Sequence, residues 1–263
     1  MSANTLPRGY QLDEYEIETV LGTGGFGITY QAHDSRLGTW VAIKEYFPQD
    51  LAGRNEAMTT IPYPGPATQH FEWGRQQFLK EARVLARFKH NNIVRVLRFL
   101  ELNGTAYMIM EYEKGLGLLD YMRKNGQPDE RTLLRIFVPI LNGLQAVHRA
   151  GLLHLDIKPD NIYLRDEGAP MLIGFGSARN VALAGEAGER VALTPAYAAL
   201  EQFKDPGKQG PWTDLYAIGA SLYHCVSGSA PVDALARYEA NRQGKLDPLT
   251  PATRLGKAGY STY

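Results

Sequence analysis

The chain has 263 residues, of which 44% are hydrophobic, and its 28 Lys and Arg residues balance 28 Asp and Glu residues. This length and composition allow a substantial core in one large domain or in two lobes. The balanced charge gives no indication of a nucleic-acid-binding protein or of a surface attracted to anionic membranes.

Further features of the sequence favour a soluble, cytoplasmic chain. The N-terminal stretch MSANTLPRGYQLDEYEIETV lacks the apolar core of a signal peptide. No run approaches the ~18–20 apolar residues that a membrane span requires. The single cysteine, Cys225, lies in an apolar run and excludes an internal disulfide framework. The six His residues are scattered, without a close pair at metal-ligand spacing, so a zinc site is not expected.

The first part of the chain predicts a mostly antiparallel sheet. Residues 15–34 have strand-like stretches around a glycine-rich centre, and residues 39–47 alternate as a strand does. Residues 48–67 are rich in Pro and Gly and are predicted to form a loop. Two further strands, NIVRVLRFLEL and TAYMIMEYE, are predicted to turn at Asn103-Gly104.

Helices are predicted from apolar residues at helical spacing. One helix is expected over residues 69–88. A second is expected over 130–151, ending at Gly151. Its apolar stripe consists of Leu134, Phe137, Ile140, Leu141, Leu144 and Val147. Residues 214–228 predict a buried helix, and residues 229–263 are less periodic.

The glycine-rich centre could bind a phosphate. Gly22, Gly24 and Gly27 form a G-x-G-x-x-G pattern, which lets backbone N–H groups approach a phosphate closely. Alone the pattern is weak, and a dinucleotide site needs a helix directly after it, whereas here another strand follows. Lys44 follows on a strand and either reaches solvent or holds phosphates, provided that a carboxylate fixes it. Glu81 is the candidate carboxylate, and its place between apolar helix positions predicts that it leans inward.

The stretch HLDIKPDN at residues 154–161 is more specific. Asp156 can orient a hydroxyl nucleophile and accept its proton, Lys158 can neutralise a moving phosphoryl group, and the Asn161 oxygen can ligate Mg²⁺. A polar loop without a function would be an unusual place for all three residues.

The order of these motifs carries a resemblance. The glycine-rich loop, VAIK, the helical Glu, HLDIKPDN, GFG at 174–176, ALE at 199–201 and DLYAIG at 214–219 follow one another. From residue 15 to about 228 this arrangement resembles the protein kinase family. It is most similar to bacterial serine/threonine kinases of the eukaryotic-like type, since GGFGITYQA and VAIKEYFP are typical of them.

The resemblance implies an α+β, bilobed protein kinase fold over residues 1–263. Its small antiparallel-sheet N-lobe, with one main helix, would span 15–110. A hinge would occupy 111–117, and a larger helical C-lobe would span 118–263. ATP would bind in the cleft, and the other partner would be a protein substrate with Ser or Thr hydroxyls. Nothing in the sequence implies nucleic acid or a membrane segment.

The resemblance also implies roles for single residues. The nucleotide-binding positions would be Leu21, Gly22, Gly24, Gly27, Ala42, Lys44, Glu81, Met110, Glu111 and Tyr112. Leu21 and Ala42 would cover the adenine, with Met110 as gatekeeper. Glu111 and Tyr112 would offer backbone groups at the hinge.

The expected catalytic positions come from the second half of the chain. They are Asp156, Lys158, Asn161 and Thr194. Asp156 would be the catalytic base, and Lys158 within DIKPDN favours serine/threonine over tyrosine substrates. Thr194 would line the substrate site. Lys44 would bind phosphates and pair with Glu81.

The sequence departs from the family at one position that matters for chemistry. The family's Asp-Phe-Gly binds Mg²⁺ through its Asp, and this chain has Gly174 there. Asn161 then remains as the one expected protein ligand, so Mg²⁺ binding should be weakened or absent. Three hypotheses follow: an impaired serine/threonine kinase, a pseudokinase that binds nucleotide and acts as a scaffold, and a nucleotide-free interaction module, which the retained motif residues disfavour.

Two smaller departures concern regulation and the C-terminal end. Leu155 replaces the Arg of the family's His-Arg-Asp, so this position cannot grip a phosphate on the activation loop. Besides Tyr197, the hydroxyl side chains between residues 174 and 201 are Ser177 and Thr194, so phosphorylation there is not expected to be the switch. Glu201 lacks the family's late-helix Arg, and the C-lobe is expected to be incomplete at its C-terminus.

Overall fold

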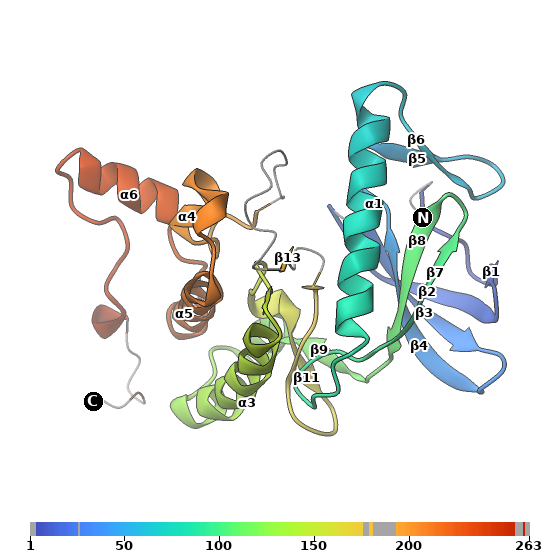
Figure 1. The fold of residues 1–263 in the computed structure, drawn as a ribbon. Helices are drawn as coiled ribbons and strands as arrows, with labels where there is room; N and C mark the ends of the chain where they lie inside the picture. Colours follow the sequence, from blue (N-terminus) through green and yellow to red (C-terminus); the bar gives the residue numbers. More distant parts are fainter. Residues whose placement is uncertain (1–3, 26, 176–178, 181–192, 256–259, 261–263) are drawn as a thin grey trace. The chain divides into compact units, whose positions relative to one another are not determined.

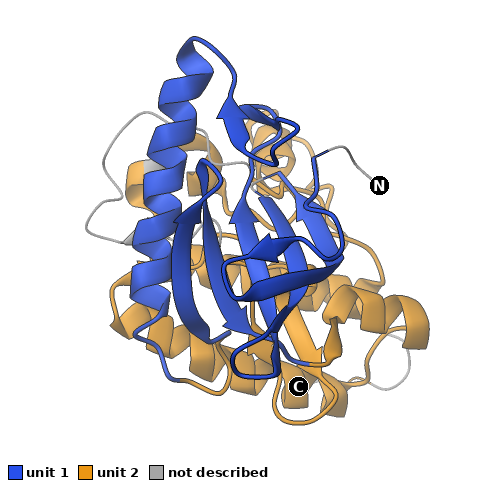
Figure 2. Ribbon diagram, turned by 90° about the vertical axis from the view of Figure 1, so that its right-hand side faces the viewer, with its two compact units in different colours: residues 1–89, 94–113 blue, residues 90–93, 114–263 orange. Residues whose placement is uncertain are grey.

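The computed structural model describes residues 4–25, 27–175, 179–180, 193–255 and 260. The chain forms two compact units, which Figure 2 distinguishes by colour. Unit 1 comprises residues 1–89 and 94–113, and unit 2 comprises residues 90–93 and 114–263. Within the described residues, no helix combines the length and the apolar character needed to cross a membrane.

Unit 1 is built on a six-stranded antiparallel sheet in the order β1-β2-β3-β4-β8-β7 (Figure 1). Its strands are β1 (Gln11–Leu12), β2 (Tyr15–Gly24), β3 (Gly27–Asp34), β4 (Thr39–Tyr46), β7 (Val96–Leu102) and β8 (Thr105–Glu111). Asn103 and Gly104 have φ values of 51° and 71°, so both central residues of the β7–β8 turn are left-handed. An Asn-Gly pair suits such a hairpin turn, because both residues tolerate positive φ.

The segment 48–67, predicted to be a loop, contains a small hairpin. Strands β5 (Ala52–Arg54) and β6 (Thr60–Pro62) pair antiparallel, and Gly53 lies opposite Ile61. The loop prediction is therefore wrong at these residues. Strands of three residues show no periodicity in the sequence, so they give a pattern-based prediction nothing to detect.

Helix α1 (Pro66–Leu85) packs against strand β4 of the sheet. It begins three residues before the predicted start, because proline suits the first turn of a helix. The rings of Phe71 and Phe78 lie 5.2 and 5.9 Å from the ring of Tyr46 on β4. A Cβ atom at Gly74 would overlap the Tyr46 hydroxyl, so the glycine permits the close approach of helix and strand.

Unit 2 is mainly helical, with short strands around its central loops. Its α-helices are α2 (Leu118–Asn125), α3 (Glu130–Arg149), α4 (Leu200–Lys204), α5 (Pro211–Ser227) and α6 (Ala234–Arg242), with 3-10 turns η1 (Pro159–Asn161), η4 (Pro206–Lys208) and η5 (Ala252–Arg254). One sheet has the order β12-β11-β9, from Met171–Leu172, Ile162–Arg165 and Gly115–Gly117, and β10 (Leu152–Leu153) pairs with β13 (Arg179–Asn180). Residues 154–161 therefore form a loop held between β10 and β11.

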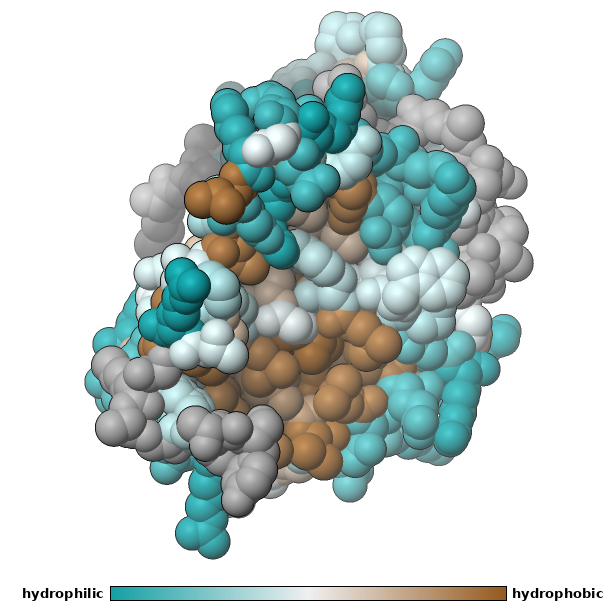
Figure 3. All heavy atoms as spheres, turned by 90° about the vertical axis from the view of Figure 1, so that its left-hand side faces the viewer, coloured by the Kyte–Doolittle hydropathy of each residue, from teal (hydrophilic) through white to brown (hydrophobic). Residues whose placement is uncertain are grey.

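Helix α3 has the predicted extent, and four of the six residues of its predicted apolar stripe are buried. The other two residues of the stripe, Leu134 and Leu141, are 58% and 38% exposed. The buried positions are Leu133, Ile136, Phe137, Ile140, Gly143, Leu144 and Val147. Figure 3 shows that apolar side chains are exposed on the face of the molecule that it presents. Because α3 is apolar on more than one face, periodicity alone did not separate these two exposed leucines from the packed positions.

Candidate active site

The predicted catalytic residues of unit 2 form one hydrogen-bonded cluster. Lys158 Nζ lies 3.1 Å from Asp156 Oδ1 and 2.9 Å from Thr194 Oγ1. Thr194 Oγ1 donates to Asp156 Oδ1 at 2.8 Å. Asn161 Nδ2 donates to the backbone oxygen of Asp156 at 2.7 Å and to its Oδ2 at 3.0 Å. The cluster joins a carboxylate, a cation, a hydroxyl and an amide from residues up to 38 positions apart.

A buried carboxylate, that of Asp214, holds the loop that bears Asp156 through hydrogen bonds to the backbone. Asp214, in the first turn of α5, is fully buried. It accepts hydrogen bonds from the backbone N–H groups of His154 and Leu155 at 2.9 and 2.8 Å, and it lies 2.7 Å from His148 Nε2. The DLYAIG motif alone does not predict this role for Asp214. The feature of the sequence that could have indicated it is an acidic residue in the first turn of an otherwise apolar helix.

Leu155 occupies the position where the family has an arginine. Its side chain is buried, and its φ of 63° is unusual for a non-glycine residue. Gln202 fixes this backbone by donating from Nε2 to the Leu155 carbonyl at 3.0 Å. A buried leucine offers no charge to a phosphate group. Ser177, which entered the prediction about phosphorylation, lies outside the described residues.

Gly174 lies directly beside Asn161. Its φ is 80°, in the region that favours glycine. A Cβ atom built at Gly174 would lie within 2.7 Å of the Oδ1, Cγ and Nδ2 atoms of Asn161. The Asn161 side chain therefore occupies space that a side chain at 174 would need.

These residues fit a magnesium site poorly. Mg²⁺ is usually held in proteins by one or two carboxylates together with phosphates and water. The neighbouring carboxylate, Asp156, already accepts hydrogen bonds from Lys158, Asn161 and Thr194. Asn161 supplies an amide oxygen, while its nitrogen is bonded to Asp156.

The glycine-rich hairpin of unit 1 combines two kinds of glycine. Gly22 and Gly24 are exposed, and a Cβ atom at either would meet nothing within 4 Å. A Cβ atom at Gly27 would overlap the carbonyl oxygen of Glu45 on the neighbouring strand. The structure therefore explains Gly27 by strand packing, and it leaves Gly22 and Gly24 free for close approach by a ligand.

Lys44 and Glu81 lie near each other, but the structure forms no ion pair between these two described residues. Atom Oε1 of Glu81 is buried without a hydrogen-bond partner. Burial raises the pKa of Glu81 to about 8, although the positive charge of Lys44 lowers it in part. The prediction that Glu81 leans inward is confirmed, whereas the expected Lys44–Glu81 pair is not present in this structure.

The raised pKa of Glu81 predicts a specific pH dependence of stability. The folded state holds this proton more tightly than the unfolded state, whose carboxyl has a pKa of about 4.5. The resulting stability is fully present below pH 4.5 and is lost as the pH rises through about 8. In the parent chain, the free energy of unfolding should therefore fall by a few kcal/mol between about pH 5 and pH 8. Glu81→Gln should remove this fall, because the amide does not titrate.

Urea unfolding at these two pH values measures the effect. Glu72→Gln is the matched control, because Glu72 lies on the same helix and its side chain is 46% exposed. The control should keep the pH dependence of the parent chain. Equal pH dependence in the parent chain and Glu81→Gln would contradict the assignment to Glu81.

The remaining nucleotide-binding candidates lie on β2, β4, β8 and the segment after it. Leu21 is 47% exposed, and Ala42 pairs with Met110 across β4 and β8. The backbone N–H of Glu111 donates to the Arg95 carbonyl at 3.0 Å. At the predicted hinge, a ligand would therefore have to use the Glu111 carbonyl or the backbone of Tyr112.

Comparison with known proteins defines the class. A model of the protein kinase domain matches residues 15–249. The chain therefore belongs to the protein kinase family, among the bacterial eukaryotic-like serine/threonine kinases, and it has the α+β protein kinase fold.

The similar proteins include a solved structure and several curated kinases. The apo form of PpkA-294 matches with a TM-score of 0.84 and 38% identity, over 98% of this chain and 89% of that chain. A probable serine/threonine-protein kinase, pknA2 from Bifidobacterium longum, is 33% identical over 221 residues, or 84% of this chain and 27% of the relative. PknL from Mycobacterium tuberculosis is 31% identical over 82% of this chain and 50% of the relative. The chain thus spans half or less of these two curated relatives.

Proposed function

We propose that this chain is an ATP-dependent protein serine/threonine kinase domain whose phosphoryl transfer is impaired at Gly174. The cluster around Asp156 carries the proposal, because it combines a base, a cation and a hydroxyl within hydrogen-bond distance. A substrate hydroxyl would donate to Asp156 as the Thr194 hydroxyl does here. Asp156 would orient this hydroxyl and accept its proton, while Lys158 would neutralise the transferred group.

Nucleotide binding is proposed for unit 1. Gly22, Gly24 and Lys44 would hold the phosphates, and Glu81 would pair with Lys44 once nucleotide is bound. Leu21, Ala42 and Met110 would contact the adenine. We propose residues 15–110 as the N-lobe, 111–117 as the hinge and 118–263 as the C-lobe of one kinase domain.

The impairment follows from the side chain that is missing at position 174. A bound metal ion would neutralise charge that develops during phosphoryl transfer, and a carboxylate at position 174 would help to hold it. Here Asn161 is the one candidate ligand, and its side chain lies against Gly174. Losing several kcal/mol of transition-state stabilisation would slow turnover by ~10³-fold or more.

A nucleotide-binding pseudokinase is the second candidate. Gly174 and the absence of a Lys44–Glu81 ion pair in this structure favour it, because phosphoryl transfer needs both parts in place. In that case the chain would bind ATP and act as a scaffold or regulator. The two candidates differ in the rate of transfer and not in nucleotide binding.

Nucleotide binding is tested by calorimetric titration with ATP. We expect the parent chain to bind ATP and Lys44→Ala to abolish binding, because the main cation for the phosphates is lost. Lys80→Ala is the matched control, since Lys80 is an exposed lysine on α1. A parent chain that binds no ATP would exclude both the kinase and the nucleotide-binding pseudokinase.

A further inference from the structure

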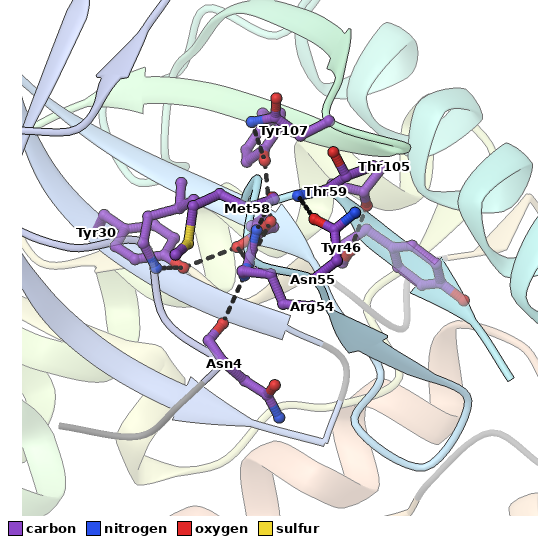
Figure 4. Close-up of polar contacts among 12 residues, drawn as sticks. Asn4, Tyr30, Tyr46, Arg54, Asn55, Met58, Thr59, Thr105 and Tyr107 are labelled. Carbon is purple, nitrogen blue, oxygen red and sulfur yellow. Dashed lines mark hydrogen bonds and ion pairs between the residues drawn. The ribbon is translucent and has the colours of Figure 1, made fainter.

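A buried ion pair links β4 to the hairpin that follows it. Arg54 Nη2 lies 2.7 Å from both carboxylate oxygens of Glu45, and the two side chains are 1% and 0% exposed. The hydroxyls of Tyr30 and Tyr107 donate to the same carboxylate at 2.7 and 2.9 Å. Figure 4 shows the side chains of Tyr30, Arg54 and Tyr107, which come from separate strands.

The remaining donors of Arg54 bind two further segments. Its Nε donates to the Asn4 carbonyl at 3.0 Å, and its Nη1 donates to the Met58 carbonyl at 2.8 Å (Figure 4). Burial lowers the pKa of Arg54, but the Glu45 charge and hydrogen bonds more than offset this effect, so the pKa is raised. The N-terminal segment, the β5–β6 hairpin and the sheet therefore meet at one charged pair.

Stability alone does not explain such a pair. Replacing both partners of a buried ion pair by well-packed apolar residues is often neutral or stabilising, because burial of charge costs desolvation. What an ion pair with several directed hydrogen bonds supplies is a fixed geometry.

Strand β4 places the pair beside the nucleotide-binding lysine. Side chains alternate along a strand, so Glu45 shares a face with the core residues Val41 and Ile43. Lys44 and Tyr46 share the opposite face, against which α1 packs through Tyr46. The carboxylate of Glu45 thus anchors β4 one residue away from Lys44.

The β5–β6 hairpin connects the ion pair to the start of α1 through hydrogen bonds. The Thr60 N–H donates to the Asn103 carbonyl at 2.8 Å, and the Tyr63 N–H donates to the Leu51 carbonyl at 2.8 Å. Thr68 Oγ1, in the first turn of α1, donates to the Tyr63 carbonyl at 2.9 Å. Continuous contacts therefore lead from Arg54 to the start of the helix that carries Glu81.

We propose that Glu45 and Arg54 are positioning residues that set the separation between Glu81 on α1 and Lys44 on β4. They do so by fixing residues 47–65, and with them the start of α1, on strand β4. The importance of this separation for nucleotide binding rests on the proposed function. The separation itself is a property of unit 1 and can be measured without nucleotide.

The test is a distance distribution between two spin labels in unit 1. The labels are attached at Leu37→Cys, where the native side chain is 73% exposed, and at Lys80→Cys, an exposed position of α1. The native cysteine, Cys225, is buried and should not take a label. The double variant Glu45→Gln/Arg54→Met should broaden the distribution and weaken ATP binding about tenfold. Arg54→Lys, which keeps the charge but loses the planar fork, should give an intermediate width.

Ile17→Ala is the control, because Ile17 is buried in the same core cluster but bonds to neither partner. It should lower the melting temperature and leave the distribution narrow. The proposal is overturned if the ion-pair variants keep the parent distribution, or if Ile17→Ala broadens it equally. A parent chain that binds no ATP would reject the proposed function, whereas the label distances would still decide this inference.

Discussion

Arg54→Met should lower the free energy of unfolding by about 3–5 kcal/mol, because it leaves the Glu45 carboxylate buried without its cation. The Glu45 side chain is fully buried, and the two tyrosine hydroxyls that remain are neutral donors. The carbonyls of Asn4 and Met58 also lose their donor. Urea unfolding followed by circular dichroism measures the loss.

Two control variants distinguish the cost of an unpaired buried charge from a general loss of stability. Glu45→Gln/Arg54→Met removes both charges and should cost at least about 2 kcal/mol less than Arg54→Met alone. Arg237→Met breaks an ion pair with Asp247 whose side chains are 32% and 51% exposed, and it should cost less than about 1 kcal/mol. Equal losses for Arg54→Met and Arg237→Met would show that Glu45 is not held as a buried charge.

Gly174→Asp should raise the rate of phosphoryl transfer by about 10²-fold or more, because it returns a carboxylate that can hold the metal and stabilise charge in the transition state. Transfer of radiolabelled phosphate from Mg-ATP to a generic basic protein measures the rate. The parent chain should transfer very slowly or not at all. A parent rate like that of an ordinary kinase would contradict the account.

The substitution also has a structural cost. The new Cβ atom requires the Asn161 side chain to move, although Asn161 is held by two hydrogen bonds to Asp156. Positive φ costs a non-glycine residue about 1–2 kcal/mol, although Asp tolerates it better than most residues. We therefore expect Gly174→Asp to be less stable than the parent chain without nucleotide, by about 1–3 kcal/mol.

Isosteric controls isolate the carboxylate. Gly174→Asn has nearly the same shape and tolerance of positive φ but no negative charge, and Gly174→Ala tests the added Cβ atom alone. Neither should restore transfer to the level of Gly174→Asp. If a well-folded Gly174→Asp remains inactive, the defect lies elsewhere and the scaffold function gains support.

Much of the fold was predictable because its signals are local. The alternation along β4 and the Asn-Gly turn at residue 103 each follow from a few neighbouring residues. The inward position of Glu81 was likewise predictable, because its apolar helical neighbours indicate the packed face. The motif at residues 154–161 is compact enough to be recognised from its spacing.

The contacts that hold these motifs in place were not predictable. Arg54 lies in a Pro- and Gly-rich stretch, and its partner Glu45 is nine positions away on a strand, so neither sequence neighbourhood indicates a buried pair. Asp214 contacts backbone groups about 60 positions earlier in the chain. Such contacts arise from tertiary packing, which periodicity and propensity do not encode.

This chain lacks the carboxylate that would hold Mg²⁺ beside Asn161. The most direct measurement is calorimetric titration of the parent chain and Gly174→Asp with ATP, in EDTA and again in saturating MgCl₂. The parent chain should bind ATP with an affinity that Mg²⁺ changes by less than about threefold, whereas Mg²⁺ should tighten binding to Gly174→Asp by about tenfold or more. A parent chain whose ATP affinity already rises about tenfold with Mg²⁺ would contradict the claim.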